Sequence, residues 1–298
     1  MTDGRRLHGA DNLPNWRNAL FVAPFLAVYL GILVYPLIWG MWISLQTYDM
    51  FDKSASFAGF DNFVNLFTDP IFRGVVRNTF VFVALTTPTF VVIGLALALA
   101  LNRPTRGAAI LRAVFFGASV LSVTIVTIIW KMMYLPGRGL ISLVIGMFGI
   151  APIPFLTSGN LALPAIAATT VWWIIGLPMM LFLAALQQIP AELYEAASLD
   201  NACRWRTLWS ITLPSIMRTF IVVVIYEIVA QFQLFGQALL LTQGGPNNAS
   251  RPIVLFIYET GFRDWNLGYA AAASEVLFLL MAVAAMLQYV ASQRREAR

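Results

Sequence analysis

The sequence predicts an all-α polytopic membrane protein with six transmembrane helices. Hydrophobic residues make up 59% of the 298 residues and charged residues only 11%, whereas about a quarter of the residues in a soluble domain are charged. Long apolar runs alternate with short polar segments along the chain. This leaves too little polar surface for a water-facing globule, so we interpret the net charge of +5 as an orientation signal and not as nucleic-acid binding.

The expected spans are apolar runs of about 20 or more residues, the length that crosses a bilayer. They cover residues 18–45, 78–101, 113–133, 161–186, 219–241 and 267–290. The first run is too long for a signal-peptide core and lacks a small-residue cleavage site, so we expect it to be retained. Pro24 and Pro36 are expected to bend the first span, and Pro88 the second.

The polar segments between the spans differ in charge. Residues 46–72 carry four aspartates, which suits the outer face, whereas residues 102–112 form a short basic loop. Two further outer loops are expected at 134–160 and 242–266. Within the first of these, the apolar piece 140–148 is too short to cross a bilayer, and we favour a surface helix there over a re-entrant turn.

Arginines set the expected orientation. Twelve of the 19 basic residues fall on the side that we assign to the cytoplasm. They are Arg5, Arg6, Arg17, Arg103, Arg106, Arg112, Arg204, Arg206, Arg218, Arg294, Arg295 and Arg298. Basic loops stay in the cytoplasm and the number of spans is even, so both termini are expected there. We expect cytoplasmic tails over 1–17 and 293–298, with a transmembrane domain over 18–292 between them.

The sequence lacks the residues that several kinds of catalytic and metal-binding sites require. Cys203 is the single cysteine, which excludes an intramolecular disulfide, and His8 is the single histidine, which argues against a metal site and a Ser-His-Asp triad. Neither Lys53 nor Lys131 stands in a Gly-x-x-x-x-Gly-Lys-Ser/Thr phosphate loop. We therefore expect no enzyme, no metal and no cofactor in this chain, with transport energy supplied by another subunit or by an ion gradient.

The longest amphipathic, charge-bearing segment is 191–214. Two glutamates lead it and two arginines follow, an order that suits a helix start and its continuation. Asn201 lies between two helix-forming halves, 191–200 and 202–210. A sharp bend needs a residue with positive φ, which asparagine tolerates best after glycine. Pro214 marks the return to an apolar run.

This segment resembles the EAA loop of the membrane subunits of ABC importers, whose pattern is Glu-Ala-Ala, a glycine six residues after the Glu, and then Ile-x-Leu-Pro. The matching residues are Glu195, Ala196, Ala197, Ile211, Leu213 and Pro214. Asn201 stands in the glycine position, which is the one departure. The resemblance implies a short cytoplasmic coupling helix that docks on a separate ATPase subunit. The expected ATPase-coupling residues are Glu192, Glu195, Ala196, Ala197, Asp200, Asn201, Leu213 and Pro214. An amphipathic helix resting on lipid headgroups is the alternative.

A second motif follows the fifth span. Its two glycines and a proline predict a tight turn at the outer surface. The turn comprises Thr242, Gln243, Gly244, Gly245 and Pro246. It resembles a signature of carbohydrate-importer permeases, including maltose-type and glycerol-phosphate-type systems, and the Gly-Tyr-Ala-Ala sequence at 268–271 fits the same group. The resemblance implies a MetI-like permease bundle in which this turn faces an extracytoplasmic binding protein.

The same resemblance implies the partners and the compartment. These are a second homologous permease, a dimer of ATPase subunits that binds ATP and Mg²⁺, an extracytoplasmic solute-binding protein, a sugar substrate and the lipid of the bacterial inner membrane. A stand-alone secondary transporter or channel is the rival hypothesis, with Glu227 or Glu275 as its ion-coupling carboxylate, although no internal repeat is visible. A polytopic membrane enzyme is disfavoured because the catalytic residues above are missing.

Polar side chains inside a membrane are costly and therefore indicate function. Glu227 and Gln231 share one face of the fifth span, and Tyr226, Gln233 and Gln237 are expected to share another. The substrate-path candidates are Glu227, Gln231, Tyr226, Gln233, Gln237, Glu275, Trp172 and Trp173. Interhelical hydrogen bonding is the alternative for the polar residues, and core packing is the favoured role for the two tryptophans.

Overall fold

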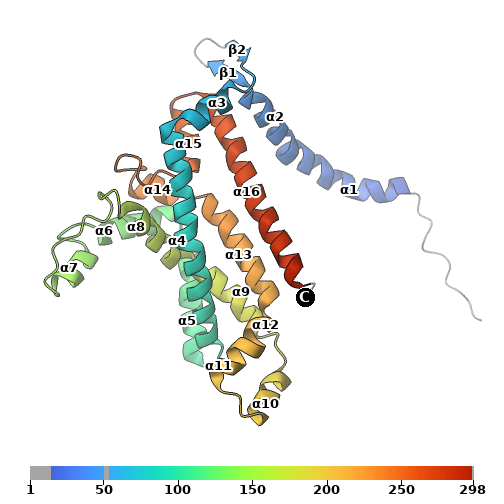
Figure 1. Cartoon of the computed structure of the whole chain (residues 1–298), viewed down its shortest axis with the longest axis vertical. Helices are drawn as coiled ribbons and strands as arrows, with labels where there is room; N and C mark the ends of the chain where they lie inside the picture. Colours follow the sequence, from blue (N-terminus) through green and yellow to red (C-terminus); the bar gives the residue numbers. More distant parts are fainter. Residues whose placement is uncertain (1–14, 50–53, 297–298) are drawn as a thin grey trace, which may run out of the picture.

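The computed structural model describes residues 15–49 and 54–296, and helices account for nearly all of its regular structure. The long helices α4 (Pro70–Leu101), α13 (Met217–Phe232) and α16 (Leu267–Glu296) pack together along the long axis of the molecule (Figure 1). A small hairpin lies at one end of this body, and the segment around residue 200 lies at the other (Figure 1).

Six stretches have the length and apolar composition of membrane spans if bent pairs of helices are counted once. Three are single helices, Phe21–Ser44, Pro70–Leu101 and Leu267–Tyr289. Three are bent pairs. The pairs are Arg106–Ala118 with Val123–Met133 at 99°, Ala162–Ile174 with Gly176–Leu186 at 47°, and Arg204–Ser215 with Met217–Phe232 at 69°.

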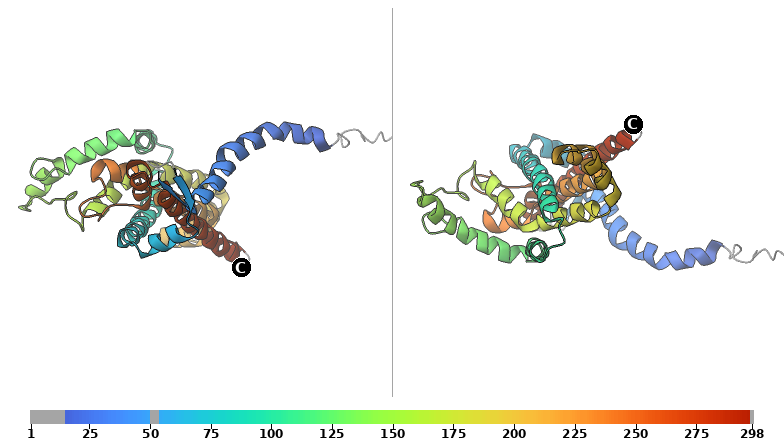
Figure 2. Two further views of the ribbon diagram at one scale, coloured as in Figure 1. Left: turned by 90° about the horizontal axis from the view of Figure 1, so that it is seen from above. Right: turned by 90° about the horizontal axis from the view of Figure 1, so that it is seen from below.

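The first span is an arm that leaves the body. It consists of α1 (Asn15–Tyr29), the π-helical turn η1 (Leu30–Val34) and α2 (Tyr35–Ser44). None of the residues in its most apolar window is buried, and its main contact with the body is that of α2 with α16. Seen along the long axis, this arm and α7 (Leu140–Gly146) extend on opposite sides of the body (Figure 2). The expected surface helix over 140–148 corresponds to α7.

The segment 46–72, expected to be a polar loop, holds three short elements of secondary structure. Strands β1 (Gln46–Asp49) and β2 (Ser54–Phe57) pair antiparallel, and α3 (Asp61–Thr68) follows. The next helix, α4, then begins at Pro70 and not at residue 78. Proline suits the first helical turn, and the Asp69 carboxylate accepts a hydrogen bond from the Ile71 amide at 2.8 Å, which caps the helix.

The third expected span is broken near its middle. Helix α5 (Arg106–Ala118) begins inside the segment expected to be a basic loop, because the Thr105 hydroxyl caps it through the Ala108 amide. Helix α6 (Val123–Met133) starts in a new direction, with the Ser122 hydroxyl accepting from the Ile125 amide at 3.4 Å.

The fourth and fifth expected spans are also discontinuous. Helices α8 (Ala162–Ile174) and α9 (Gly176–Leu186) meet at Ile175. The bend lies where Pro178 acts, because a proline has no N–H for the carbonyl four residues before it, here that of Ile174. A Cβ on Gly176 would overlap the Phe115 carbonyl, so only glycine allows α5 to pass this close. Helix α13 ends at Phe232, and α14 (Gly236–Leu241) resumes after a break.

The hairpin end of the body is closed by α15 (Ile253–Tyr258), the π-helical turn η3 (Glu259–Arg263) and the start of α16. The Asn62 amide donates to the Ser44 and Gln46 carbonyls at 2.8 and 2.9 Å, which ties α3 to the end of α2. A Cβ on Gly268 would overlap the Gln46 carbonyl. The first turn of α16 therefore depends on a glycine to approach β1.

Replacing Gly268 by alanine is expected to destabilise this end by about 1–3 kcal/mol, because the added methyl group overpacks a rigid backbone contact. The thermal midpoint of the detergent-purified protein, followed by loss of the monodisperse fraction, measures this cost. Gly74→Ala is the control, since nothing lies within 4 Å of a Cβ there. Equal midpoints for the two variants would contradict the close approach.

Candidate functional site

The segment that the sequence singles out forms an elbow at the end of the molecule opposite the hairpin (Figure 1). We call residues 191–215 the elbow. Its elements are α10 (Ala191–Leu199), α11 (Arg204–Thr207), the π-helical turn η2 (Leu208–Thr212) and α12 (Leu213–Ser215). The second half begins at Arg204, slightly later than expected, because Cys203 is the extended residue before α11.

Asn201 makes the bend, as predicted, with a φ of 55°. The Asn201 amide donates to the Ser198 carbonyl at 3.1 Å, and the Ala202 amide donates to the Ala197 carbonyl at 2.9 Å. These two bonds form the Schellman arrangement that ends many helices and satisfies their last carbonyls. Asparagine can replace the usual glycine here because its short side chain tolerates the left-handed conformation.

The two halves of the elbow are braced across the bend. The Tyr194 hydroxyl, from α10, lies 3.1 Å from the Thr212 hydroxyl of η2. Ala197 is buried on the same inner side. Sequence reasoning missed Tyr194 and Thr212, although an amphipathic helix that places a tyrosine on its inner face offered a signal.

The charged residues of the elbow point outward. The side chains of Glu192, Glu195 and Asp200 are exposed, and those of Arg204 and Arg206 are exposed as well. The Glu195 backbone carbonyl accepts from the Ser198 hydroxyl at 2.7 Å, which leaves the carboxylate free of that bond. The elbow therefore presents both signs of charge on a rigid, bent surface.

The remaining matched residues join the elbow to the body. Ala196 is exposed, and Pro214 is exposed at the start of α12. Leu213 packs against a buried cluster that includes Phe182 of α9 and Ile216. A pocket of about 380 Å³ lies between Leu99 of α4 and elbow residues that include Ala202 and Thr212. This end of α4 therefore faces the elbow across a pocket, while Leu213 of the elbow packs on the buried cluster that also contains Ala98 and Leu101 of α4.

Glu227 and Gln231, the first two substrate-path candidates, bind each other inside the helix bundle. Gln231 Nε2 donates to Glu227 Oε2 at 2.9 Å, and both side chains are buried. Glu227 Oε1 has no hydrogen-bond partner among the described residues. The predicted shared face is confirmed, but in this conformation it points into the helix bundle.

The second set of path candidates does not form one helix face, which corrects the expectation. Helix α13 ends before Gln233, and Gln237 lies in α14, because the break at 233–235 changes the direction of the chain. Tyr226 and Gln233 are exposed, whereas Gln237 is buried. Glu275 faces α2, since a Cβ on Gly40 would lie 3.5 Å from its Oε1.

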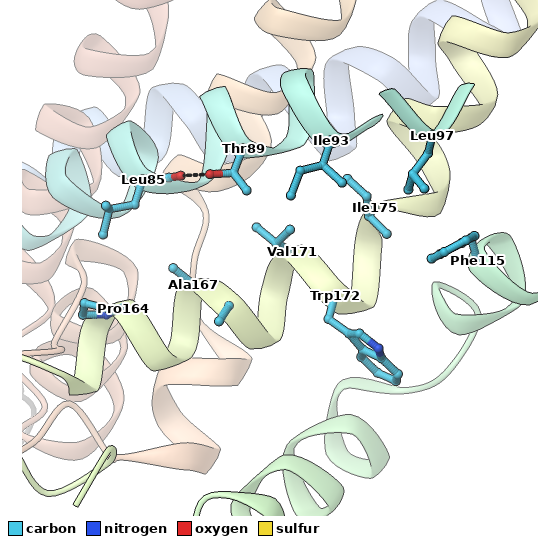
Figure 3. A pocket seen from close by; sticks show the side chains of 11 residues that line it. Leu85, Thr89, Ile93, Leu97, Phe115, Pro164, Ala167, Val171, Trp172 and Ile175 are labelled. Carbon is cyan, nitrogen blue, oxygen red and sulfur yellow. Dashed lines mark hydrogen bonds between the residues drawn. The ribbon is translucent and has the colours of Figure 1, made fainter. Parts of the chain in front are cut away.

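The two neighbouring tryptophans have different surroundings. The Trp173 indole donates to the Leu121 carbonyl at 3.1 Å, at the break between α5 and α6. Trp172 is 46% exposed and lies across from Trp130, with ring centroids 5.5 Å apart. It borders an apolar pocket of about 530 Å³ in which Leu85, Thr89, Ile93 and Leu97 of α4 face α8 (Figure 3).

The outer turn has an unusual backbone. Gln243, Gly244, Asn247 and Asn248 have positive φ values of 54°, 78°, 49° and 60°. The Thr242 and Ser250 hydroxyls lie 2.7 Å apart and close the turn. Gln243, Asn247 and Asn248 are exposed, and Gly244 is buried. The turn therefore presents amide side chains on a compact backbone.

The sequence profile of a family described as "Binding-protein-dependent transport system inner membrane component" matches residues 66–297. The diacetylchitobiose uptake system permease protein NgcF of Streptomyces coelicolor is 33% identical over 291 residues, covering 92% of this chain and 81% of that one. The sn-glycerol-3-phosphate transport system permease protein UgpA of Salmonella typhimurium is 32% identical over 275 residues, covering 92% and 93%.

Two further comparisons cover nearly the whole chain. The multiple sugar-binding transport system permease protein MsmF of Streptococcus mutans is 30% identical over 281 residues, covering 94% of this chain and 96% of that one. A crystal structure of a bacterial alginate ABC transporter, in complex with an alginate pentasaccharide-bound periplasmic protein, contains a chain with a TM-score of 0.83. That chain is 24% identical, with 94% and 95% coverage, and it shows the shared fold. The predicted all-α permease bundle is confirmed.

Asn201→Gly is expected to preserve the elbow, whereas Asn201→Val should cost about 1–2 kcal/mol, because a β-branched residue is strained at positive φ. Hydrogen exchange of the residue 201 and 202 amides in the purified protein measures the opening of the bend. Matching exchange rates for the glycine and valine variants would show that the bend does not depend on the left-handed conformation.

Trp173→Phe is expected to loosen the break between α5 and α6, because it leaves the Leu121 carbonyl without its donor, at a cost of about 1 kcal/mol. A spin label at Ser119→Cys, in a Cys203→Ser background, should report greater mobility. Trp172→Phe is the matched control because it keeps the Trp173 bond. Equal mobility in the two variants would contradict a role for that bond.

Proposed function

The chain belongs to the family of binding-protein-dependent inner-membrane transport components, as the sequence predicted, and we propose that it is the permease subunit of a bacterial carbohydrate importer. Its relatives carry names that refer to multiple sugars, diacetylchitobiose and sn-glycerol-3-phosphate. The Thr-Gln-Gly-Gly-Pro sequence of the outer turn supports the same branch. A sugar or polyol is the substrate class that follows.

The family and the apolar helices make this chain a multi-pass protein of the inner membrane. We propose that it pairs with a second, homologous permease and that both rest on two ATPase subunits, which bind ATP and Mg²⁺. An extracytoplasmic solute-binding protein delivers the solute to the outer turn. The arginine distribution supports an orientation with both termini and the elbow in the cytoplasm.

The observation that carries this proposal is the braced elbow. Two backbone hydrogen bonds close the bend, and the Tyr194–Thr212 contact spans it. Such a bend can keep its shape when a force acts on α10. It leads from α9 on one side to α13 on the other. Movement of the ATPases against α10 would therefore reorient two spans together, which is the physical requirement for alternating access.

Within the elbow, we assign docking to the exposed face of α10. The Glu195 carboxylate would accept charge-assisted hydrogen bonds from a basic group of the ATPase. Glu192 and Asp200 add negative charge on the same exposed surface. The small side chain of Ala196 lets the helix lie close to its partner, whereas buried Ala197 packs toward the body.

For the solute path, exposure favours Tyr226 and Gln233, which present a hydroxyl and an amide beside the break after α13. Both groups can exchange hydrogen bonds with sugar hydroxyls. The buried pair Glu227 and Gln231 is better suited to holding the bundle together. Trp172 remains a candidate for stacking on a sugar ring because its indole is partly exposed.

Glu195→Ala is expected to reduce solute uptake by about tenfold or more, since a hydrogen bond to a charged group contributes about 1.5–3 kcal/mol to docking. ATP hydrolysis by the assembled complex and the amount of permease in the membrane should persist. Uptake of labelled solute and phosphate release, measured on the same proteoliposomes, separate the two quantities.

The matched control is Asp264→Ala, which removes an exposed carboxylate between η3 and α16, away from the elbow. It should leave both uptake and hydrolysis unchanged. Normal uptake by the Glu195→Ala complex would contradict the assignment of the elbow as the coupling element.

A further inference from the structure

Helix α4 runs from the outer turn toward the elbow as one continuous helix, and Pro88 does not interrupt it. It contains 32 residues, which at 1.5 Å per residue is about 48 Å, more than the thickness of a hydrocarbon core. In contrast, three of the six spans are interrupted by bends of 47° to 99°. An unbroken helix transmits displacement between its ends, whereas a bent pair can absorb it at the bend.

The outer part of α4 is bonded to the segment that contains the outer turn. Asn78 Nδ2 donates to the Asn248 carbonyl at 2.7 Å and to the Arg251 carbonyl at 3.1 Å. The adjacent Thr79 hydroxyl accepts from the Ile253 amide at 3.0 Å. We call these three hydrogen bonds the outer clamp. They join residues at least 170 positions apart in the sequence.

The outer clamp binds a segment, residues 248–253, that is itself held by internal contacts. Ser250 is fully buried, its amide donates to the Gly244 carbonyl at 3.3 Å, and its hydroxyl meets that of Thr242. Arg251 forms an ion pair with Glu259 of η3. Because these contacts hold the segment together, we expect the outer turn and the residues bonded to Asn78 and Thr79 to move as one unit.

Apolar packing strengthens the same connection. Phe72 of α4 and Phe256 of α15 lie with ring centroids 5.6 Å apart, inside a buried cluster. The Arg251 guanidinium lies 5.2 Å from the Phe256 ring centroid. Polar and apolar contacts thus fix α15 and the outer turn to the same helix.

The opposite end of α4 packs closely on α9, the helix that leads into the elbow. A Cβ on Gly94 would lie 3.3 Å from both the Met179 amide nitrogen and the Pro178 Cβ, so α4 and α9 are in close contact. Helix α9 leads into α10, and Leu99 lines the pocket against the second half of the elbow. Both halves of the elbow therefore adjoin α4 or the helix packed on it.

We propose that Asn78 and Thr79 are positioning residues that make the outer turn move with α4, and that α4 links the state of this turn to the state of the elbow. Docking at the outer turn is thereby communicated to the ATPases, and nucleotide binding at the ATPases is communicated to the outer turn. The inference rests on the proposed function, because it gives the two ends of α4 their partners. Coupling between two sites is reciprocal, so it can be tested from either end.

The test starts from the nucleotide end, because the proposed function names the ligand there, ATP with Mg²⁺. The permease, assembled with its partner permease and ATPases in lipid nanodiscs, is compared with and without a non-hydrolysable ATP analogue and Mg²⁺. Hydrogen exchange of the amides is followed over residues 242–253 and over the elbow. In the unmodified complex, nucleotide is expected to change exchange at both places.

Asn78→Asp is the decisive variant, because it keeps the shape of the side chain and replaces two donor hydrogens by a charged oxygen facing two carbonyls. The nucleotide-dependent change over 242–253 is expected to fall at least about fivefold, while the change over the elbow persists. Thr79→Val, which removes the acceptor for the Ile253 amide, should act in the same direction. Should Asn78→Asp fail to assemble, Thr79→Val carries the test.

Asn102→Asp is the matched control, since it makes the same substitution in an exposed residue at the other end of α4. It should leave both responses intact. A purely structural role would raise exchange in the outer turn with and without nucleotide but would preserve the difference, and that result overturns the inference. A full nucleotide response in both clamp variants overturns it as well.

The proposed function fails in a different way. If nucleotide changes exchange at neither place in the unmodified complex, the elbow is not coupled to an ATPase and the inference falls with that function. If the elbow responds and the outer turn does not, the proposed function stands and only the linkage through α4 is refuted.

Discussion

The elbow depends on one backbone conformation. At Asn201 the chain adopts a positive φ, and the last carbonyls of α10 are satisfied by the two amides that follow. Without that turn, α10 would either continue into the membrane surface or leave polar groups unpaired. With it, the chain turns between α10 and α11, and the Tyr194–Thr212 contact can form across the bend. Helices α9 and α13, which flank the elbow, also pack against each other.

The candidate membrane spans are of two kinds, single helices and bent pairs of helices. Breaks inside an apolar environment expose backbone groups that need partners, and the chain supplies them locally. The Ser122 hydroxyl caps α6, and the Trp173 indole binds the Leu121 carbonyl at the same break. Helix α16 has no such break, and α4 stays helical across Pro88, so the bend expected there does not interrupt the helix. The molecule therefore combines continuous helices with bends that are stabilised individually, an arrangement that suits the coupling that we propose between its two ends.

Polar residues in the spans serve two purposes that composition alone does not separate. Glu227 and Gln231 satisfy one another inside the bundle, whereas Tyr226 and Gln233, only a few positions away, are exposed. The difference arises because α13 ends at Phe232 and the chain changes direction. A helical wheel that continues past Phe232 places Tyr226, Gln233 and Gln237 on one face, although they do not lie in one helix. For this reason the expected second face was wrong.

The sequence by itself determined the all-α class, most of the helix-forming stretches, the family and the bend at Asn201, because each depends on local composition or on a short motif. The tertiary structure alone decided the breaks in three spans, the orientation of the polar side chains and the clamp on the outer turn. Those features are set by close approaches such as Gly176 against Phe115, and by hydrogen bonds such as that from Asn78 to Asn248, 170 residues away. Only the folded chain brings such partners together, so no local pattern encodes them.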